Sequence, residues 1–564
     1  MYIVSNRFHS LYKLHKLCKT NITSHFASIM SSCVSLDFLN VNQDFKSFNT
    51  RQHSHSISEG VTTHSNNENE AYDFSYKEAI KALNGLQSNA QTISNAIQRE
   101  KGSNSCHSLD KTIYFLSLLD IKPSDLNQLN VIHVSGTKGK GSTCAFADSI
   151  LRRFGYKTGF YSSPHLVAAR ERIRLNGEPI TKKLFAKYFW SVYKTIERRK
   201  DASIGMPPYF NFLTLMAFEV FLKEKVDATV LEVGIGGQYD CTNVVPKPIV
   251  TGVSSLGLDH CSLLGATIEQ IAWQKSGIFK SSVPAFTVEQ CGAAMKVLKS
   301  RAQELRSSSL HVCPLLSLYP HSVPIELGIK GLLSGEVQKL NASLALQLTN
   351  SWLNKINNNK YQISSFITKD GTFCDIFPLN ANHINGLSKC CWPGRCQILR
   401  KNNCIYFLDG AHTHESLSHC SKWFCDESQK LLTSNRLVRV LIFNCTGDRP
   451  TERLMRALDI KFDIAIFCPN KVDNNKDFTS DNSNFTVTSQ REAEICSINA
   501  KVWSKINEKT LISKQSCISD AIKFINDKTQ KEKPLPVHVL VTGSMHLVGS
   551  VLSLIDPDLQ SLNN

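Results

Sequence analysis

The residues with the clearest chemical potential lie in one stretch, VIHVSGTKGKGST, which spans Val131–Thr143. Its glycines are Gly136, Gly139 and Gly141. A glycine-rich loop lets backbone N–H groups turn toward phosphate oxygens, and Lys140 adds a positive charge there. Ser142 or Thr143 offers a hydroxyl to Mg²⁺. The stretch therefore predicts a binding site for a nucleoside triphosphate.

The stretch departs from the common P-loop pattern in one respect. That pattern places lysine directly after the last glycine, whereas here Lys140 precedes Gly141. A tight strand-to-helix connection that binds nothing is the alternative interpretation of any glycine-rich turn. The lysine, the hydroxyl pair and the flanking elements favour nucleotide binding.

A strand and a helix must position this loop. Residues 131–134 alternate in β-branched character, which is typical of a strand. Beyond the loop, apolar residues recur at helical spacing at Phe146, Ile150, Leu151 and Phe154. The expected order is strand, glycine loop, helix, with the loop at the positive end of the helix dipole.

Three further predicted strands each deliver a polar side chain near their end. They are 158–162 followed by Ser163, 227–233 containing Glu232, and 249–255 followed by His260. In open α/β sheets ligands gather at the carboxyl ends of strands. A carboxylate is costly to bury unless it is paired, so Glu232 is interpreted as a metal ligand, with a structural salt bridge as the alternative. A lone histidine such as His260 is commonly structural, but it belongs to the same predicted edge.

The order of elements predicts an α/β fold with two doubly wound domains. A second alternation of strands and helices follows residue 395, with strands at 405–408, 438–443, 463–467 and 537–541. Such alternation favours mostly parallel sheets, and 564 residues exceed what one hydrophobic core usually supports. We expect a P-loop-type ATPase domain over 73–382 and a smaller Rossmann-like domain over 383–564.

Two local expectations concern connecting segments. Arginines at every second position of Arg170–Leu175 predict an exposed strand before a turn at Asn176-Gly177. Between about Ile363 and Gly386 the sequence predicts irregular chain, with an inter-domain hinge near Trp392.

The N-terminal segment has the composition of a targeting sequence. Residues 1–36 contain no acidic residue, and their positive charges include Arg7, Lys13, Lys16 and Lys19. This is typical of a mitochondrial transit peptide, with a merely disordered extension as the alternative. Initiation at Met30 would discard most of these charges, so we expect a mitochondrial product (matrix or inner membrane) and a cytoplasmic one. Residues 1–72 are predicted to be a disordered leader.

Charge and apolar content narrow the class of protein. No apolar run reaches about 18 residues, so no transmembrane span is expected, although peripheral association with mitochondrial membranes stays open. The net charge is +16, but the basic residues are spread along the chain rather than gathered with aromatics, so no nucleic-acid partner is expected. Anionic small molecules fit this charge. The 19 cysteines include no C-x-x-C pair and are interpreted as reduced thiols.

Ten sequence blocks resemble the folylpolyglutamate synthase family of Mur-ligase-like amide ligases. The blocks are GTKGKGST (136–143), SSPHLVAARERIR (162–174), MPPYFNFLTLMAF (206–218), LEVGIGGQYDCTN (231–243), SSLGLDHCSLLG (254–265), IAWQKSGIF (271–279), WPGR (392–395), FLDGAHT (407–413), FNCTGDR (443–449) and VLVTGSMHLVG (539–549). Blocks in register over about residues 108–550 are more specific than any single motif.

The resemblance implies roles for individual residues. The ATP phosphates would be held by Gly139, Lys140, Gly141 and Ser142. The magnesium sites would be supplied by Ser163, Glu232 and His260. The second domain would bring Arg395, Asp409 and His412 to the phosphates and ribose. Lys275 looks like the lysine that is carbamylated in this superfamily, with an ordinary cation near phosphate as the alternative. The expected catalytic residues are Lys140, His260 and Lys275.

The activity that the resemblance implies is ATP-dependent addition of L-glutamate to the γ-carboxyl of reduced folates and their polyglutamates, through an acyl phosphate. The expected cofactors are ATP and Mg²⁺, with K⁺ or another monovalent cation as a further candidate. The partners are the small-molecule substrates, and a monomer is expected. Three alternatives stay open: a dihydrofolate synthase that joins glutamate to dihydropteroate, a nucleotide-binding scaffold without catalysis, and a P-loop protein that binds nucleic acid.

Overall fold

A computed structural model describes most of the chain beyond the leader. The described residues are 75–87, 107–321, 325–327, 334–357, 364–367, 373–432, 436–445, 451–474, 481, 489–529 and 535–557. The predicted leader, with Met30, lies outside them, as do residues 446–449 of the FNCTGDR block. None of the helices in these ranges combines the length and the apolar character that crossing a membrane requires.

The first sheet has eight strands in the order β4-β3-β2-β5-β1-β6-β7-β8. The strands are β1 (Val131–Ser135), β2 (Thr158–Tyr161), β3 (Ile173–Leu175), β4 (Glu178–Pro179), β5 (Ala228–Glu232), β6 (Val250–Val253), β7 (Pro284–Thr287) and β8 (Ser309–Val312). From β2 to β8 all neighbours pair in parallel, and only β3 and β4 are added antiparallel. The mostly parallel α/β sheet predicted for this part of the chain is confirmed.

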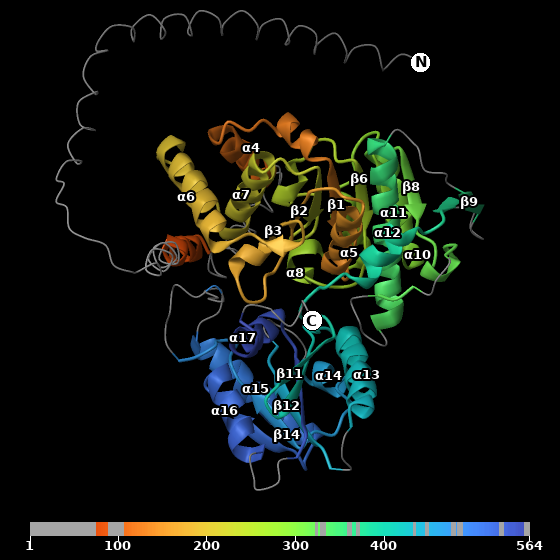
Figure 1. Cartoon of the computed structure of the whole chain (residues 1–564). Coiled ribbons are helices and arrows are strands. Elements are labelled where there is room, and N and C mark those ends of the chain that lie inside the picture. Colours follow the sequence, from red (N-terminus) through yellow and green to blue (C-terminus); the bar gives the residue numbers. More distant parts are fainter. Residues whose placement is uncertain are drawn as a thin grey trace, which may run out of the picture. The chain divides into compact units, whose positions relative to one another are not determined.

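Helices cover both faces of this sheet (Figure 1). They are α4 (His107–Leu118), α5 (Lys140–Arg153), α6 (Lys182–Arg199), α7 (Tyr209–Lys223), α8 (Cys261–Leu264), α9 (Ile268–Ser276), α10 (Gly292–Glu304), α11 (Ser334–Ile356) and α12 (Ala381–Ser388). Successive strand residues point to opposite faces. In β2, Tyr161 therefore packs in the core beneath α6 and α7, whereas Phe160 packs in the core beneath α5 and α11.

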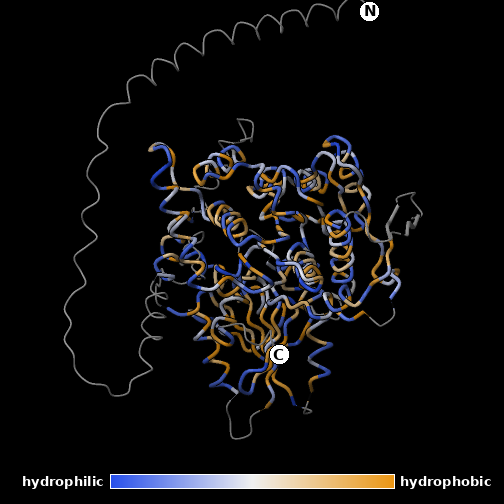
Figure 2. The backbone as a smooth tube through the Cα atoms, turned by 45° about the horizontal axis from the view of Figure 1, so that its top comes forward, coloured by the Kyte–Doolittle hydropathy of each residue, from blue (hydrophilic) through white to orange (hydrophobic). Residues whose placement is uncertain are grey.

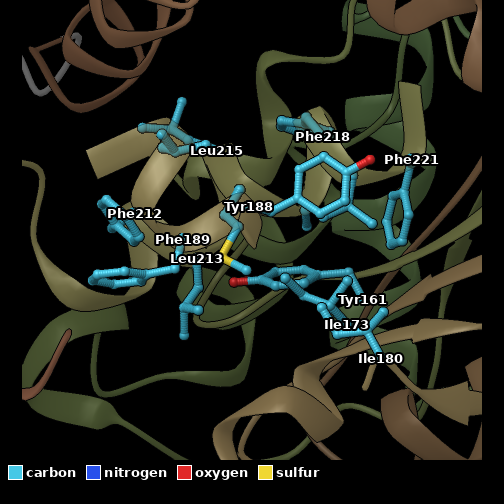
Figure 3. Close-up of a cluster of buried hydrophobic side chains, with 14 of the residues drawn as sticks. Tyr161, Ile173, Ile180, Tyr188, Phe189, Phe212, Leu213, Leu215, Phe218 and Phe221 are labelled. Carbon is cyan, nitrogen blue, oxygen red and sulfur yellow. The ribbon is translucent and has the colours of Figure 1, made fainter. Parts of the chain in front are cut away.

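The core beneath α6 and α7 is rich in aromatic side chains (Figure 3). Phe189 and Phe212 contact each other with ring centroids 5.0 Å apart, and both are fully buried. Phe212 is thus a core residue. Phe210, which precedes it by two positions, is only partly buried and packs against this core. Sequence alone could not separate these two environments.

The second sheet has six strands in the order β11-β12-β16-β13-β14-β15. The strands are β11 (Gln397–Lys401), β12 (Cys404–Leu408), β13 (Val438–Phe443), β14 (Ile464–Phe467), β15 (Leu511–Lys514) and β16 (Val537–Thr542). All pairs are parallel except β11 with β12. The associated helices are α13 (His414–Lys430), α14 (Thr451–Arg456), α15 (Ser489–Ile506), α16 (Ile518–Thr529) and α17 (Met545–Ile555). Hydrophobic residues gather on the strands, and the helices alternate in hydropathy (Figure 2).

Two local predictions were wrong. Residues Ala169–Arg172 form a 3₁₀ turn and only Ile173–Leu175 are a strand, with Arg172 and Arg174 buried instead of exposed. The region expected to be irregular contains the hairpin β9 (Ser364–Ile367) with β10 (Phe373–Ile376), as well as α12. Helix α12 packs so closely on α5 that a Cβ at Gly386 would collide with Ile150. The turn at Asn176-Gly177 is confirmed, since both residues have positive φ.

Candidate active site

The glycine loop lies between β1 and α5, at the carboxyl edge of the first sheet. Backbone N–H groups of Thr137 and Lys138 both donate to the Ser255 carbonyl at 3.0 Å, just beyond β6. Ser254 Oγ donates to the Lys138 carbonyl at 2.8 Å. These three hydrogen bonds fasten the loop to the segment that follows the neighbouring strand.

Two of its glycines are required by geometry. Gly136 has φ 144° and Gly139 has φ 87°, values that residues with a side chain rarely adopt. A Cβ at Gly136 would collide with the Ser254 side chain, and one at Gly139 with the Asn341 side chain on α11. In the first turn of α5, Lys140 and Gly141 are only partly buried, and Gly141 lines a pocket. A phosphate in that pocket would face the positive end of the helix.

Two lysine side chains converge on one carbonyl of the loop. Lys140 Nζ donates to the Gly136 carbonyl at 3.2 Å, and Lys275 Nζ, from α9, donates to the same oxygen at 2.8 Å. Lys275 is buried, with 3% of its surface exposed. Burial and the charge of Lys140 lower the pKa of Lys275 from 10.5 to about 7. Two of the three expected catalytic residues therefore lie together.

Ser163 and Glu232 come together where β2 and β5 end. The backbone N–H of Ser163 donates to Glu232 Oε2 at 3.1 Å, and the Ser163-Pro164 peptide bond is cis. Burial raises the pKa of Glu232, while Lys140 and that hydrogen bond oppose the rise. Both residues line a pocket that also includes Gly141.

This pair fits a magnesium ion only as part of a larger ligand set. Among the described residues, no three His, Cys, Asp or Glu side chains come together as a ready-made metal cage. Mg²⁺, however, usually takes one or two protein oxygens together with substrate phosphates and water. A buried carboxylate beside a serine and a phosphate loop suits that kind of site.

His260 stands on another loop, between β6 and α8. It is exposed, has φ 51° and precedes α8. Its backbone N–H donates to Asp259 Oδ1 at 3.0 Å, and the Asp259 carboxylate lies 3.4 Å from Lys138 Nζ. Burial alone would raise the pKa of Asp259, but His412 and Lys138 outweigh it and hold that pKa below its usual range. His260 is not among the residues that line the pocket of Ser163 and Glu232.

The part of the chain beyond residue 390 contributes three expected residues. Arg395 lines the pocket and contacts Met545. Asp409, after β12, accepts from the N–H groups of Cys396 and Ala411, both at 2.9 Å. His412 Nε2 lies 2.9 Å from Lys138 Nζ. Asp409 thus shapes the loops that carry Arg395 and His412 toward the phosphate loop.

Comparisons with known proteins agree with this architecture. No protein-family model matches the chain. The human protein "Folylpolyglutamate synthase, mitochondrial" is 42% identical over 549 residues, covering 86% of this chain and 92% of the human one. A Candida albicans folylpolyglutamate synthase is 38% identical and covers 85% of this chain and 96% of its own.

The chain belongs to the folylpolyglutamate synthase family. The activity of the family, ATP-dependent ligation of glutamate to folates, is the one expected from the sequence. Among solved structures, Mycobacterium tuberculosis folylpolyglutamate synthase complexed with ADP superposes with a TM-score of 0.64 at 22% identity, covering 86% of this chain and 99% of that one. The Thermotoga maritima folylpolyglutamate synthase does so with a TM-score of 0.57 at 26% identity, covering 81% and 95%. The two-sheet fold is thus the fold of the family.

Four residues lie at this site whose role was not predicted from the sequence. Lys138 and Asp259 join the phosphate loop to His412. Trp392 and Arg174 line the pocket of Ser163 and Glu232. All four residues stand inside recognised blocks. The burial of Arg174 could not be predicted, because alternating arginines are typical of a solvent-exposed strand.

Proposed function

We propose that this chain adds L-glutamate to the γ-carboxyl of tetrahydrofolate and its polyglutamates, with ATP bound at the glycine loop. In this proposal Gly139, Lys140, Gly141 and Ser142 hold the phosphates. The observation that carries it is the convergence of Lys140, Lys275 and the pocket of Ser163 and Glu232 on one edge of the sheet. The charge of Lys140, the backbone amides of the glycine loop and the carboxylate of Glu232 would then lie near the phosphoryl group that is transferred.

The first step makes the carboxylate a better acyl donor. A carboxylate oxygen of the folate attacks the γ-phosphorus, the bond to the β-phosphate oxygen breaks, and ADP leaves with that electron pair. Lys140 would turn from the Gly136 carbonyl to the phosphate and offset its charge. Mg²⁺ held by Ser163 and Glu232, with His260 from the next loop, would offset charge on the same group.

The second step forms the amide. The amine of glutamate attacks the acyl carbon, the carbon–oxygen bond to phosphate breaks, inorganic phosphate leaves, and the nitrogen gives up a proton. Water would destroy the acyl phosphate, so the site must close before the first step. The 2.9 Å contact of Lys138 with His412 supports closure by the segment that carries Arg395, Asp409 and His412.

Lys275 is proposed to carry a carbamate. A buried amine with a pKa of about 7 is substantially neutral near physiological pH, and only a neutral amine adds to CO₂. The carbamate would replace a buried cation by an anion beside the phosphate loop and could share in binding the divalent ion. An uncarbamylated cation near phosphate is the alternative state.

Divalent-metal and nucleotide binding are supported by solved relatives. A Yersinia pestis bifunctional folylpolyglutamate synthase/dihydrofolate synthase is complexed with AMPPNP and Mn ion, and an E. coli FolC with DHPP and ADP. For this chain we propose Mg²⁺ as the divalent ion, with K⁺ as an accessory monovalent ion. We also propose a monomer with domains over 73–382 and 383–564. The "mitochondrial" names of relatives support a mitochondrial product, and a cytoplasmic one is proposed beside it.

Isotope transfer tests the proposed chemistry. When the substrate carries ¹⁸O in its γ-carboxyl group, one labelled oxygen should appear in inorganic phosphate for each amide formed. Phosphate without label, at full amide yield, would exclude the acyl phosphate.

A further inference from the structure

The pocket beside the phosphate loop holds more positive charge than the proposed roles use. Its charged lining consists of Arg174, Arg395, Glu171 and Glu232. The carboxylate of Glu171 is already committed to the backbone N–H groups of residues 166–168, at 2.6 to 3.2 Å. Glu232 is assigned to the metal ion. Neither acid forms an ion pair with the arginines among the described residues.

Arg174 is a buried cation with few partners. It retains only 7% of its exposure. Nη1 donates to the Gly177 carbonyl at 3.1 Å, and Nε is buried without a hydrogen-bond partner in the described part of the chain. Burial lowers the pKa of Arg174, while Glu171 and Asp148 act against this from a distance. Burying a guanidinium without a carboxylate partner is costly, and an anion bound in the pocket would offset that cost.

Trp392 fixes the guanidinium of Arg174 in the pocket. Arg174 lies opposite Phe160 in the β2–β3 register. The indole stacks on Phe160 with ring centroids 5.3 Å apart, and the guanidinium lies 5.2 Å above the indole. A Cβ at Gly141 would lie 3.3 Å from Trp392 Nε1. The stack therefore holds Arg174 close to the first turn of α5.

We propose that Arg174 contacts the phosphoryl group that is transferred, first as the γ-phosphate of ATP and then in the acyl phosphate. The inference rests on the phosphate site proposed above. A guanidinium presents planar N–H donors that match phosphate oxygens, and it keeps its charge throughout. Arg395 lines the same pocket three residues after Trp392, so the phosphoryl group would have two arginines within the same lining.

Nucleotide affinities distinguish contact with the transferred phosphoryl group from a purely structural role of Arg174. We would measure Kd for ADP and for the β,γ-methylene analogue of ATP by calorimetry with Mg²⁺. Arg174→Gln should weaken binding of the analogue about ten- to hundredfold and that of ADP less than about twofold. Arg174→Lys should recover part of the loss. Arg153→Gln, which removes an exposed arginine at the other end of α5, is the matched control and should change neither affinity.

Other outcomes would overturn the inference. Equal weakening of both nucleotides with a lower Tm would mean that Arg174 only supports Trp392. Unchanged nucleotide affinities with a raised KM for folate or glutamate would mean that it binds a substrate carboxylate. If Arg174→Gln does not fold, the test falls to Arg174→Lys. Wild-type affinity of this variant for the analogue would contradict the proposed contact between Arg174 and the phosphoryl group. Lys140→Ala tests the proposed phosphate site independently of Arg174. If this variant bound both nucleotides as tightly as the wild type, the proposed phosphate site would be refuted.

Discussion

Lys138 Nζ lies 2.9 Å from His412 Nε2, so a residue of the phosphate loop touches a residue that follows the first strand pair of the second sheet. A lysine ammonium can only donate, so Nε2 accepts, and Nδ1 carries the proton that faces the Gly410 carbonyl at 2.8 Å. Asp259 completes the group, 3.4 Å from Lys138. This contact joins the two sheets beside the proposed nucleotide.

Removing His412 should weaken nucleotide binding without unfolding the protein. We expect His412→Ala to raise KM for ATP about tenfold, because a hydrogen bond with a charged partner is lost. The Tm should change by less than about 2 °C, since the side chain is half-buried. His419→Ala, at an exposed position on α13, the helix that follows His412, serves as control. A wild-type KM for ATP in His412→Ala would show that the contact does not serve the nucleotide.

Lys140→Ala should abolish ligation and keep the fold. The loop is fastened by Ser254 and Ser255 independently of Lys140. We expect kcat to fall about a thousandfold or more, because the charge at the transferring phosphate is lost. Circular dichroism and Tm should match the wild type. Near-normal turnover would remove Lys140 from the reaction.

Glu232→Gln should raise the Mg²⁺ concentration that the enzyme needs for activity. The glutamine keeps an oxygen for the Ser163 N–H but loses the negative charge. We expect the Mg²⁺ concentration for half-maximal rate to rise about ten- to hundredfold. Stability should not fall, since burial already raises the pKa of this carboxyl and penalises its charged form.

A matched control for this titration is Glu219→Gln. Glu219 lies on α7, and burial raises its pKa too. The Mg²⁺ titration of Glu219→Gln should follow the wild type. If Glu232→Gln followed it as well, Glu232 would have no part in metal binding.

The order of strand, glycine loop and helix was predictable because the residues before the loop have the pattern of a strand and those after it have apolar residues at helical spacing. The edge position of Glu232 was predictable from one carboxylate that ends an apolar run. The burial of Arg174 was not, because it depends on Trp392, more than 200 positions away in the printed sequence. Likewise, α12 could not be placed, since its packing rests on contact between Gly386 and Ile150 of α5.

Carbamylation of Lys275 should depend on pH. With its pKa at about 7, the neutral amine becomes more abundant as pH rises through neutrality. Carbamate at a fixed CO₂ concentration should therefore increase between about pH 6 and pH 8. Incubation with ¹³C-bicarbonate should give a carbamate NMR signal that Lys275→Arg abolishes.

Lys280→Arg is the control for this signal. Lys280 is also partly buried, and burial lowers its pKa to about 8, but its Nζ donates to the Asn243 carbonyl at 3.0 Å, away from the loop. The carbamate signal should persist in this variant. A signal that follows Lys280 instead of Lys275, or none at any pH, would contradict the assignment.

Incorporation of labelled glutamate would show whether the chain extends reduced folates. The purified full chain would be given ATP and Mg²⁺ with either tetrahydrofolate or dihydropteroate. We expect incorporation with tetrahydrofolate and none with dihydropteroate. Incorporation with dihydropteroate alone would make the chain a dihydrofolate synthase. No incorporation with either substrate, despite bound ATP, would make it an inactive nucleotide-binding scaffold. Either result would contradict the proposed function.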